Sequence, residues 1–62
     1  MLLDIYEKDN RKAEVYKGDK GFYVKLYEND FIIDIINLED KSIHYAESCA
    51  ENYVERIGTF YQ

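Results

Sequence analysis

The 62-residue chain has no proline, one cysteine and one histidine, and these scarcities exclude several kinds of small protein. A single cysteine, Cys49, cannot form an internal disulfide bond. Because His44 is the only histidine, a zinc site built from several cysteines and histidines is excluded as well. A domain of this size buries only about 60% of the surface that its unfolded chain exposes. Its stability must therefore come from good packing or from self-association.

Linkers, repeats and low-complexity tracts are also missing, so residues 1–62 are expected to form one domain. No basic segment followed by an apolar run begins the chain, because acidic residues interrupt it, and a secretory signal is not expected. The longest apolar stretch, residues 31–38, is too short to cross a membrane. With one unpaired cysteine, these features predict a soluble cytoplasmic protein that does not associate with membranes.

Basic residues are scarce in the second part of the chain. The 13 acidic and 8 basic residues give a net charge of −5. Residues 1–21 are balanced, so residues 22–62 carry the whole excess of negative charge. This distribution argues against binding to a phosphate backbone, which needs clustered lysine and arginine. It fits a basic protein partner, and it equally fits simple solubility.

Short segments rich in β-branched and aromatic residues lie between polar turn clusters at residues 9–11, 18–21, 28–30 and 39–42. This arrangement predicts successive β-hairpins. The third segment alternates most clearly, which places Phe22, Val24 and Leu26 on one face of the sheet. Three residues fall on the other face: Tyr23, Lys25 and Tyr27.

The other segments follow the same alternation less regularly. In the second and first segments the inward residues are predicted to be Ala13, Val15, Leu3 and Ile5. The outward residues of these two segments are predicted to be Glu14, Tyr16, Asp4 and Tyr6. In the fourth segment Ile33 and Ile35 share one face while Ile36 and Leu38 share the other. Either a β-bulge near Ile35 and Ile36 or a strand covered on both faces would explain this change of phase.

After Ser42 the apolar spacing becomes helical. The apolar stripe of the predicted helix comprises Ala46, Cys49, Ala50, Tyr53, Val54 and Ile57. Ser42 or His44 is predicted to cap the helix N-terminus, and Gly58 to end the helix after Arg56. The predicted fold class is therefore α+β, a three- to four-stranded antiparallel meander with one C-terminal amphipathic helix on one face, in the order β-β-β-β-α.

No arrangement typical of an enzyme or a cofactor site is present. Cys49 and His44, the one possible nucleophile and base, would point roughly 140° apart on one helix. The glycines and lysine of residues 18–21 lie between two strands rather than before a helix, so a hairpin turn explains them better than a phosphate site. The acidic residues of 30–40 lack the spacing of a calcium loop. We therefore expect no catalytic residue, cofactor or metal ion.

Tyrosine is the most over-represented residue type, with seven in the chain. Four of them are predicted to lie on the sheet face opposite the helix: Tyr6, Tyr16, Tyr23 and Tyr27. Such a face can be a protein interface, or cross-strand tyrosine pairs can simply stabilise the sheet. Stacking of nucleobases is disfavoured, because Asp4, Glu14 and Asp34 are expected on this face against one Lys25.

An acidic row is predicted on the outer side of the helix, formed by Glu47, Glu51 and Glu55. Like charges at this spacing cost a few tenths of a kcal/mol per pair. The row is either a contact surface for a basic partner or an ordinary solvated face.

Residues 45–54, Tyr-Ala-Glu-Ser-Cys-Ala-Glu-Asn-Tyr-Val, resemble the C-terminal helix of small proteins from tailed phages that infect marine cyanobacteria. Those proteins carry a similar Tyr-Ala-Glu-Asp-Ala-Ala-Glu-Asn-Trp sequence. Here Ser48 and Cys49 replace the Asp-Ala pair and Tyr53 replaces the tryptophan. The resemblance implies a phage-encoded accessory protein without catalytic activity that acts inside a bacterial cell.

Together these features predict a small acidic accessory protein that binds a protein partner through its tyrosine-rich sheet face or its acidic helix. A homo-oligomer formed through the sheet face or an edge strand is the alternative hypothesis. A nucleic-acid-binding module is a minor alternative.

Overall fold

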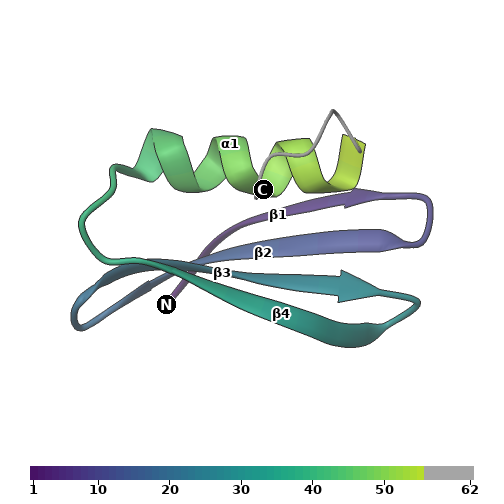
Figure 1. The fold of residues 1–62 in the computed structure, drawn as a ribbon, viewed down its shortest axis with the longest axis horizontal. Helices are drawn as coiled ribbons and strands as arrows, with labels where there is room; N and C mark the ends of the chain where they lie inside the picture. The colour runs from purple at the N-terminus through teal and green to yellow at the C-terminus, as the bar shows by residue number, and fades with distance from the viewer. Residues whose placement is uncertain (56–62) are drawn as a thin grey trace.

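The computed structural model describes residues 1–55, which form four strands followed by one helix (Figure 1). The elements are β1 (Leu2–Lys8), β2 (Arg11–Gly18), β3 (Gly21–Glu28), β4 (Phe31–Leu38) and α1 (Ile43–Glu55). All strand pairs are antiparallel, and the strand order in the sheet is β1-β2-β3-β4. The predicted α+β meander with a C-terminal helix on one face is thus confirmed.

Tight turns join the strands, as the polar clusters predicted. Asn29 and Asp30 both have positive φ angles, 53° and 69°, which is the pattern of a type I′ hairpin turn. Gly21 has a φ of 131°, and a Cβ atom there would lie 2.8 Å from the backbone oxygen of Glu39. The glycine at position 21 is therefore required by the backbone, which supports the hairpin interpretation of residues 18–21.

The core lies between the sheet and α1. The strands contribute the buried side chains of Ala13, Val15, Val24, Leu26 and Leu38, and the helix contributes Ala46, Ala50, Tyr53 and Val54. Phe22 packs against this cluster, so the face predicted for Phe22, Val24 and Leu26 is confirmed. The small side chains of Ala46 and Ala50 are completely buried, which lets the helix approach the sheet closely.

The helix begins where the sequence predicted. The Ser42 hydroxyl accepts a hydrogen bond of 3.2 Å from the backbone N–H of Tyr45, so Ser42 is the N-cap, and His44 lies inside the helix. Cys49 is only half-buried at the margin of the core, whereas the apolar stripe had placed it fully inside. Ile57 and the predicted helix end at Arg56 and Gly58 lie outside the described residues.

α1 packs on β1, β2 and β3, and it lies towards the β1 side of the sheet (Figure 1). β4 is on the side farthest from the helix. The helix therefore covers one face of the sheet unevenly, and the fourth strand extends beyond its cover.

The face assignment predicted for β1 is wrong. Asp4 pairs with Val15 and Tyr6 pairs with Ala13, so both lie on the helix side, while Ile5 lies on the opposite face and is 48% exposed. The cause is a β-bulge at Leu3, where the register shifts between Leu2 and Asp4. Beyond the bulge every β1 side chain changes face, and Tyr6 packs against the core beside the helix.

The change of phase in β4 also has a different position from the one predicted. Asp34 pairs with Leu26 and Ile32 pairs with Tyr27, so the extra residue of the bulge is Ile33 and not a residue near Ile35 and Ile36. Ile36 and Leu38 share one face and Ile35 lies on the other, as the alternation indicated, and the structure shows that Ile36 and Leu38 are the residues on the helix side. The strand is not covered on both faces, because its isoleucines at 32, 33 and 35 are about half exposed.

Candidate protein-interaction surface

The sheet face turned away from α1, called here the open face, has a cluster of three tyrosines at its centre. Tyr16 on β2 and Tyr23 on β3 are direct cross-strand partners, and Tyr27 lies further along β3 on the same face. The rings of Tyr16 and Tyr23 stack with centroids 5.0 Å apart and planes only 3° from parallel. All three side chains are half-buried, so their neighbours hold them while part of each stays accessible.

Glu14 connects these tyrosines. Its carboxylate accepts a hydrogen bond of 2.7 Å from the Tyr16 hydroxyl, and Nζ of Lys12 lies 3.8 Å from its other oxygen. Partial burial acts to raise the pKa of Glu14, but hydrogen bonds with Tyr16 and Tyr27 and the charges of Lys12 and Lys25 outweigh it, so the pKa is lowered. The carboxylate therefore stays ionised and keeps the tyrosine hydroxyls oriented.

The pKa values of the tyrosines respond to the same contacts. The hydrogen bond to Glu14, then partial burial, raises the pKa of Tyr16 to about 12. Partial burial and then the hydrogen bond to Glu14 raise the pKa of Tyr27. Both hydroxyls thus remain protonated donors at neutral pH, which makes the cluster a fixed arrangement of rings and hydroxyl groups.

Two lysines lie over the tyrosine rings. Nζ of Lys25 is 4.7 Å from the centre of the Tyr16 ring, and Nζ of Lys12 is 4.7 Å from the centre of the Tyr27 ring. Together with the Tyr16–Tyr23 stack, these cation–π contacts occupy ring surface that a stacked base would need.

The charge of the open face differs from the prediction. Asp4 and Asp34, which were expected on this face, pair with Val15 and Leu26 and so lie on the helix side. Lys12 joins Lys25 on the open face, opposite the acidic residue Glu7 of β1. With Glu14, the face carries two lysines and two glutamates and is close to neutral.

Aliphatic side chains surround the tyrosine cluster. The two edge strands place on the open face a set of residues that are 44–49% exposed: Leu2, Ile5, Ile32 and Ile35. The open face therefore has an aromatic and polar centre between two apolar margins, which makes it the candidate surface for an interaction.

Tyr6 does not belong to this surface. It lies on the helix side, where burial raises its pKa, as do the negative charges of Glu47, Asp4 and Glu51. Of the four tyrosines predicted to share the open face, the structure brings together Tyr16, Tyr23 and Tyr27 only.

The acidic row of α1 lies along the β1 edge of the sheet. Glu47 and Glu51 act electrostatically on Tyr6, and Glu55 forms an ion pair of 2.7 Å with Lys8. Glu47 is half-buried, whereas Glu51 and Glu55 are exposed. The row is thus partly engaged by the protein's own β1, which leaves less of it for a partner than its helical spacing indicated.

Cys49 and His44, the possible nucleophile and base, have different surroundings in the structure. Burial raises the pKa of the Cys49 thiol, which disfavours the reactive thiolate, and His44 is exposed in the first turn of α1. Among the described residues 1–55, no three side chains of histidine, cysteine, aspartate or glutamate are grouped so that they could hold a metal ion.

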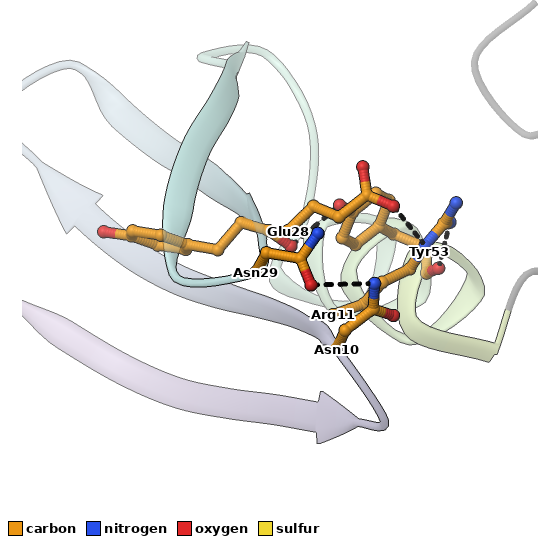
Figure 2. Close-up of polar contacts among 6 residues, drawn as sticks. Asn10, Arg11, Glu28, Asn29 and Tyr53 are labelled. Atoms are coloured by element: carbon orange, nitrogen blue, oxygen red, sulfur yellow. Dashed lines mark hydrogen bonds and ion pairs between the residues drawn. The ribbon is translucent and has the colours of Figure 1, made fainter.

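Sequence reasoning missed Arg11, which had been assigned to a turn. Its guanidinium lies 4.7 Å over the Tyr53 ring, and its Nη1 donates a hydrogen bond of 3.1 Å to the Tyr53 carbonyl oxygen (Figure 2). Nε of the same side chain is 4.0 Å from a carboxylate oxygen of Glu28. The signal for this position was the alternation itself, because Arg11 has the same parity as Ala13 and Val15 and therefore faces the helix.

Comparisons with protein-family models, with curated proteins and with solved structures find no match to this chain. Among residues 1–55, the 13-residue α1 is neither long enough nor apolar enough to cross a membrane. Any inference about function therefore depends on the open face and its surroundings.

Proposed function

We propose that this chain is a small non-catalytic interaction module that binds a protein partner through its open face. The observation that carries the proposal is the fixed cluster of Tyr16, Tyr23 and Tyr27 between aliphatic margins on β1 and β4. Tyrosine is enriched among residues that contribute most to protein binding. Side chains held in place before binding lose less conformational freedom when the complex forms, so the cluster favours affinity.

A protein partner fits this surface better than a nucleic acid does. The face is close to neutral, the whole chain has a net charge of −5, and the tyrosine rings already contact each other and two lysines. Binding to single strands depends on a positively charged groove and on free ring faces. Single-stranded DNA and RNA are expected not to bind at physiological salt, and micromolar binding in a fluorescence-anisotropy titration would contradict the proposal.

The setting of this function is proposed from the resemblance of residues 45–54 to phage proteins. A phage accessory protein would act in the cytoplasm of an infected bacterium and would bind a host or phage protein there. Because the open face is close to neutral, basic residues of a partner would make a secondary contact with the acidic row of α1.

Affinity capture with matched baits tests the proposal. The baits are the wild-type chain, Tyr23→Ala on the open face, and Tyr45→Ala on the exposed side of α1, where the tyrosine is 48% exposed. Each bait is incubated with a cyanobacterial lysate, and bound proteins are quantified by mass spectrometry. We expect a partner that the wild type and Tyr45→Ala retain and that Tyr23→Ala loses. Equal retention by all three baits would contradict a role for the open face.

A further inference from the structure

We infer that the outer edge of β4 pairs with β4 of a second copy of this chain, so that two sheets join into one continuous antiparallel sheet. β4 is an edge strand, and among residues 1–55 no other strand pairs with its outer side. The backbone groups on that side point away from β3 and are free to form a further ladder of hydrogen bonds.

The composition of β4 is unusual for an exposed edge. Its exposed apolar residues include Phe31, which is 74% exposed, and the three isoleucines at 32, 33 and 35. Asp34 is the single charged residue of the strand, and the strand has no lysine or proline. Edges that stay unpaired are often protected by lysine or proline, and β4 has neither; its bulge at Ile33 and the inward Asp34 limit the segment that can pair to residues 34–38.

The other edge of the sheet provides an internal comparison. β1 carries Asp4, Glu7 and Lys8, and the ion pair of Lys8 with Glu55 ties this edge to α1. The helix lies mainly over the β1 side, and of β4 only Ile36 and Leu38 reach the core. One edge is therefore charged and covered, while the other is apolar and open, and this asymmetry selects β4 as the pairing edge.

The bulge at Ile33 determines which part of β4 can pair. The strand is regular from Asp34 to Leu38, where every residue has a direct partner on β3. A two-fold axis near Ile35 or Ile36 sets isoleucine opposite isoleucine and keeps Asp34 away from its own copy. Residues 34–38 can thus pair in the antiparallel direction with the same residues of a second copy.

The distribution of charge favours a second copy over a charged partner. The acidic row of α1 lies at the β1 side, so pairing through β4 places the two rows at opposite ends of the dimer. The acidic row is therefore kept out of the interface, where the acidic residues are Asp34 and those of the flanking turns, Asp30, Glu39 and Asp40. A basic partner would instead be attracted to the β1 side, and β4 offers it one carboxylate only, that of Asp34.

The size of the contact fits a reversible dimer. Adding a strand along β4, with side chains packed against their neighbours across the new strand pair, buries on the order of 1,000 Å² in total, the lower limit for specific interfaces. A dimer of moderate affinity that dissociates on dilution is therefore expected. Pairing in the plane of the sheet leaves the open face uncovered. The dimer can therefore be absent while the open face still binds a partner, and the dimer can form while the open face binds none.

Sedimentation velocity across low to high micromolar concentration tests the inference. Two variants are matched, Ile35→Lys on β4 and Ile5→Lys on β1, since both isoleucines are 48% exposed on the open face of an edge strand. A third variant, Asn37→Lys, replaces an exposed polar residue of β4 and removes no apolar group. Circular dichroism confirms that each variant is folded.

We expect the wild type and Ile5→Lys to form dimers with the same concentration dependence. Ile35→Lys and Asn37→Lys should weaken the dimer at least tenfold, because each places two ammonium groups near the two-fold axis. A wild type that stays monomeric at every concentration would overturn the inference. Equal weakening by Ile5→Lys and Ile35→Lys would also overturn it, since that result indicates a dimer formed through the open face.

Discussion

The guanidinium of Arg11 stacks on the ring of Tyr53 and donates a hydrogen bond of 3.1 Å to the carbonyl oxygen of the same residue. The Tyr53 hydroxyl in turn donates a hydrogen bond of 2.8 Å to the carbonyl oxygen of Tyr27. These two residues join β2, β3 and the last turn of α1 at the end of the sheet where the turns at Asn10 and Asn29 are also hydrogen-bonded (Figure 2). The contact therefore ties the last turn of α1 to β2 and β3.

Arg11→Met is expected to lower the free energy of unfolding by about 2 kcal/mol, because it removes a charge-assisted hydrogen bond and a cation–π contact while keeping an aliphatic stem. Urea denaturation followed by circular dichroism measures the effect. Lys20→Met, in an exposed turn, is the control and should change stability little. Equal stability of the two variants would show that the Arg11–Tyr53 contact does not hold the helix.

Gly21→Ala is expected to destabilise the fold by about 3 kcal/mol, since the φ of 131° is unfavourable for alanine and the added Cβ would meet the Glu39 backbone at 2.8 Å. Gly18→Ala is the matched control in the same turn, where the Cβ would meet a ring carbon of Tyr23 at 3.2 Å. Thermal melting distinguishes the two variants. A Gly21→Ala protein as stable as Gly18→Ala would contradict the described turn.

The Tyr16–Glu14 hydrogen bond makes stability depend on pH at the alkaline end. The pKa of Tyr16 is raised from 10.0 to about 12 in the folded protein, so this contribution is complete below pH 10 and is lost as the pH rises towards 12. Spectrophotometric titration of tyrosine should show a component near pH 12, from Tyr16, that ionises later than the others, although the pKa values of Tyr6 and Tyr27 are also raised. In Glu14→Gln that delay should shrink, and an unchanged titration curve would indicate that the hydrogen bond does not form.

Cys49 should react slowly with a thiol reagent such as dithiobisnitrobenzoate in the native protein at neutral pH. The side chain is half-buried and burial raises the pKa of the thiol, so little thiolate is present. The reaction should accelerate strongly in denaturing urea, where the thiol regains its ordinary pKa. A native rate as fast as the denatured one would contradict the placement of Cys49 at the margin of the core.

Much of the fold could be predicted because alternation and turn chemistry agree in the middle of the sheet. Phe22, Val24 and Leu26 face the helix as their spacing indicated, and Ser42 caps it. The edges could not be predicted, because a single bulged residue on β1, Leu3, reverses the face of every side chain that follows. A bulge leaves no compositional trace, so the alternation of Leu3 and Ile5 with Asp4 and Tyr6 indicated the wrong face.

The candidate site was predicted in part for the same reason. Tyr16 and Tyr23 lie where alternation placed them, but Tyr6 follows the bulge and lies on the helix side. The near-neutral charge of the open face also depends on the two bulges, which turn Asp4 and Asp34 to the helix side, whereas Lys12 belongs to the open face by the alternation of β2. Arg11 looked like a turn residue, and only its contact with α1 gives it a structural role.

The central claim is that the open face binds a protein partner, and affinity measurements on single tyrosine variants test it most directly. Isothermal titration calorimetry with the captured partner would compare the wild type with Tyr16→Ala, Tyr23→Ala, Tyr27→Ala and the control Tyr45→Ala. We predict that at least one open-face variant weakens binding by about 2 kcal/mol while remaining folded, and that Tyr45→Ala binds as the wild type does. Wild-type affinity in all three open-face variants would contradict the account.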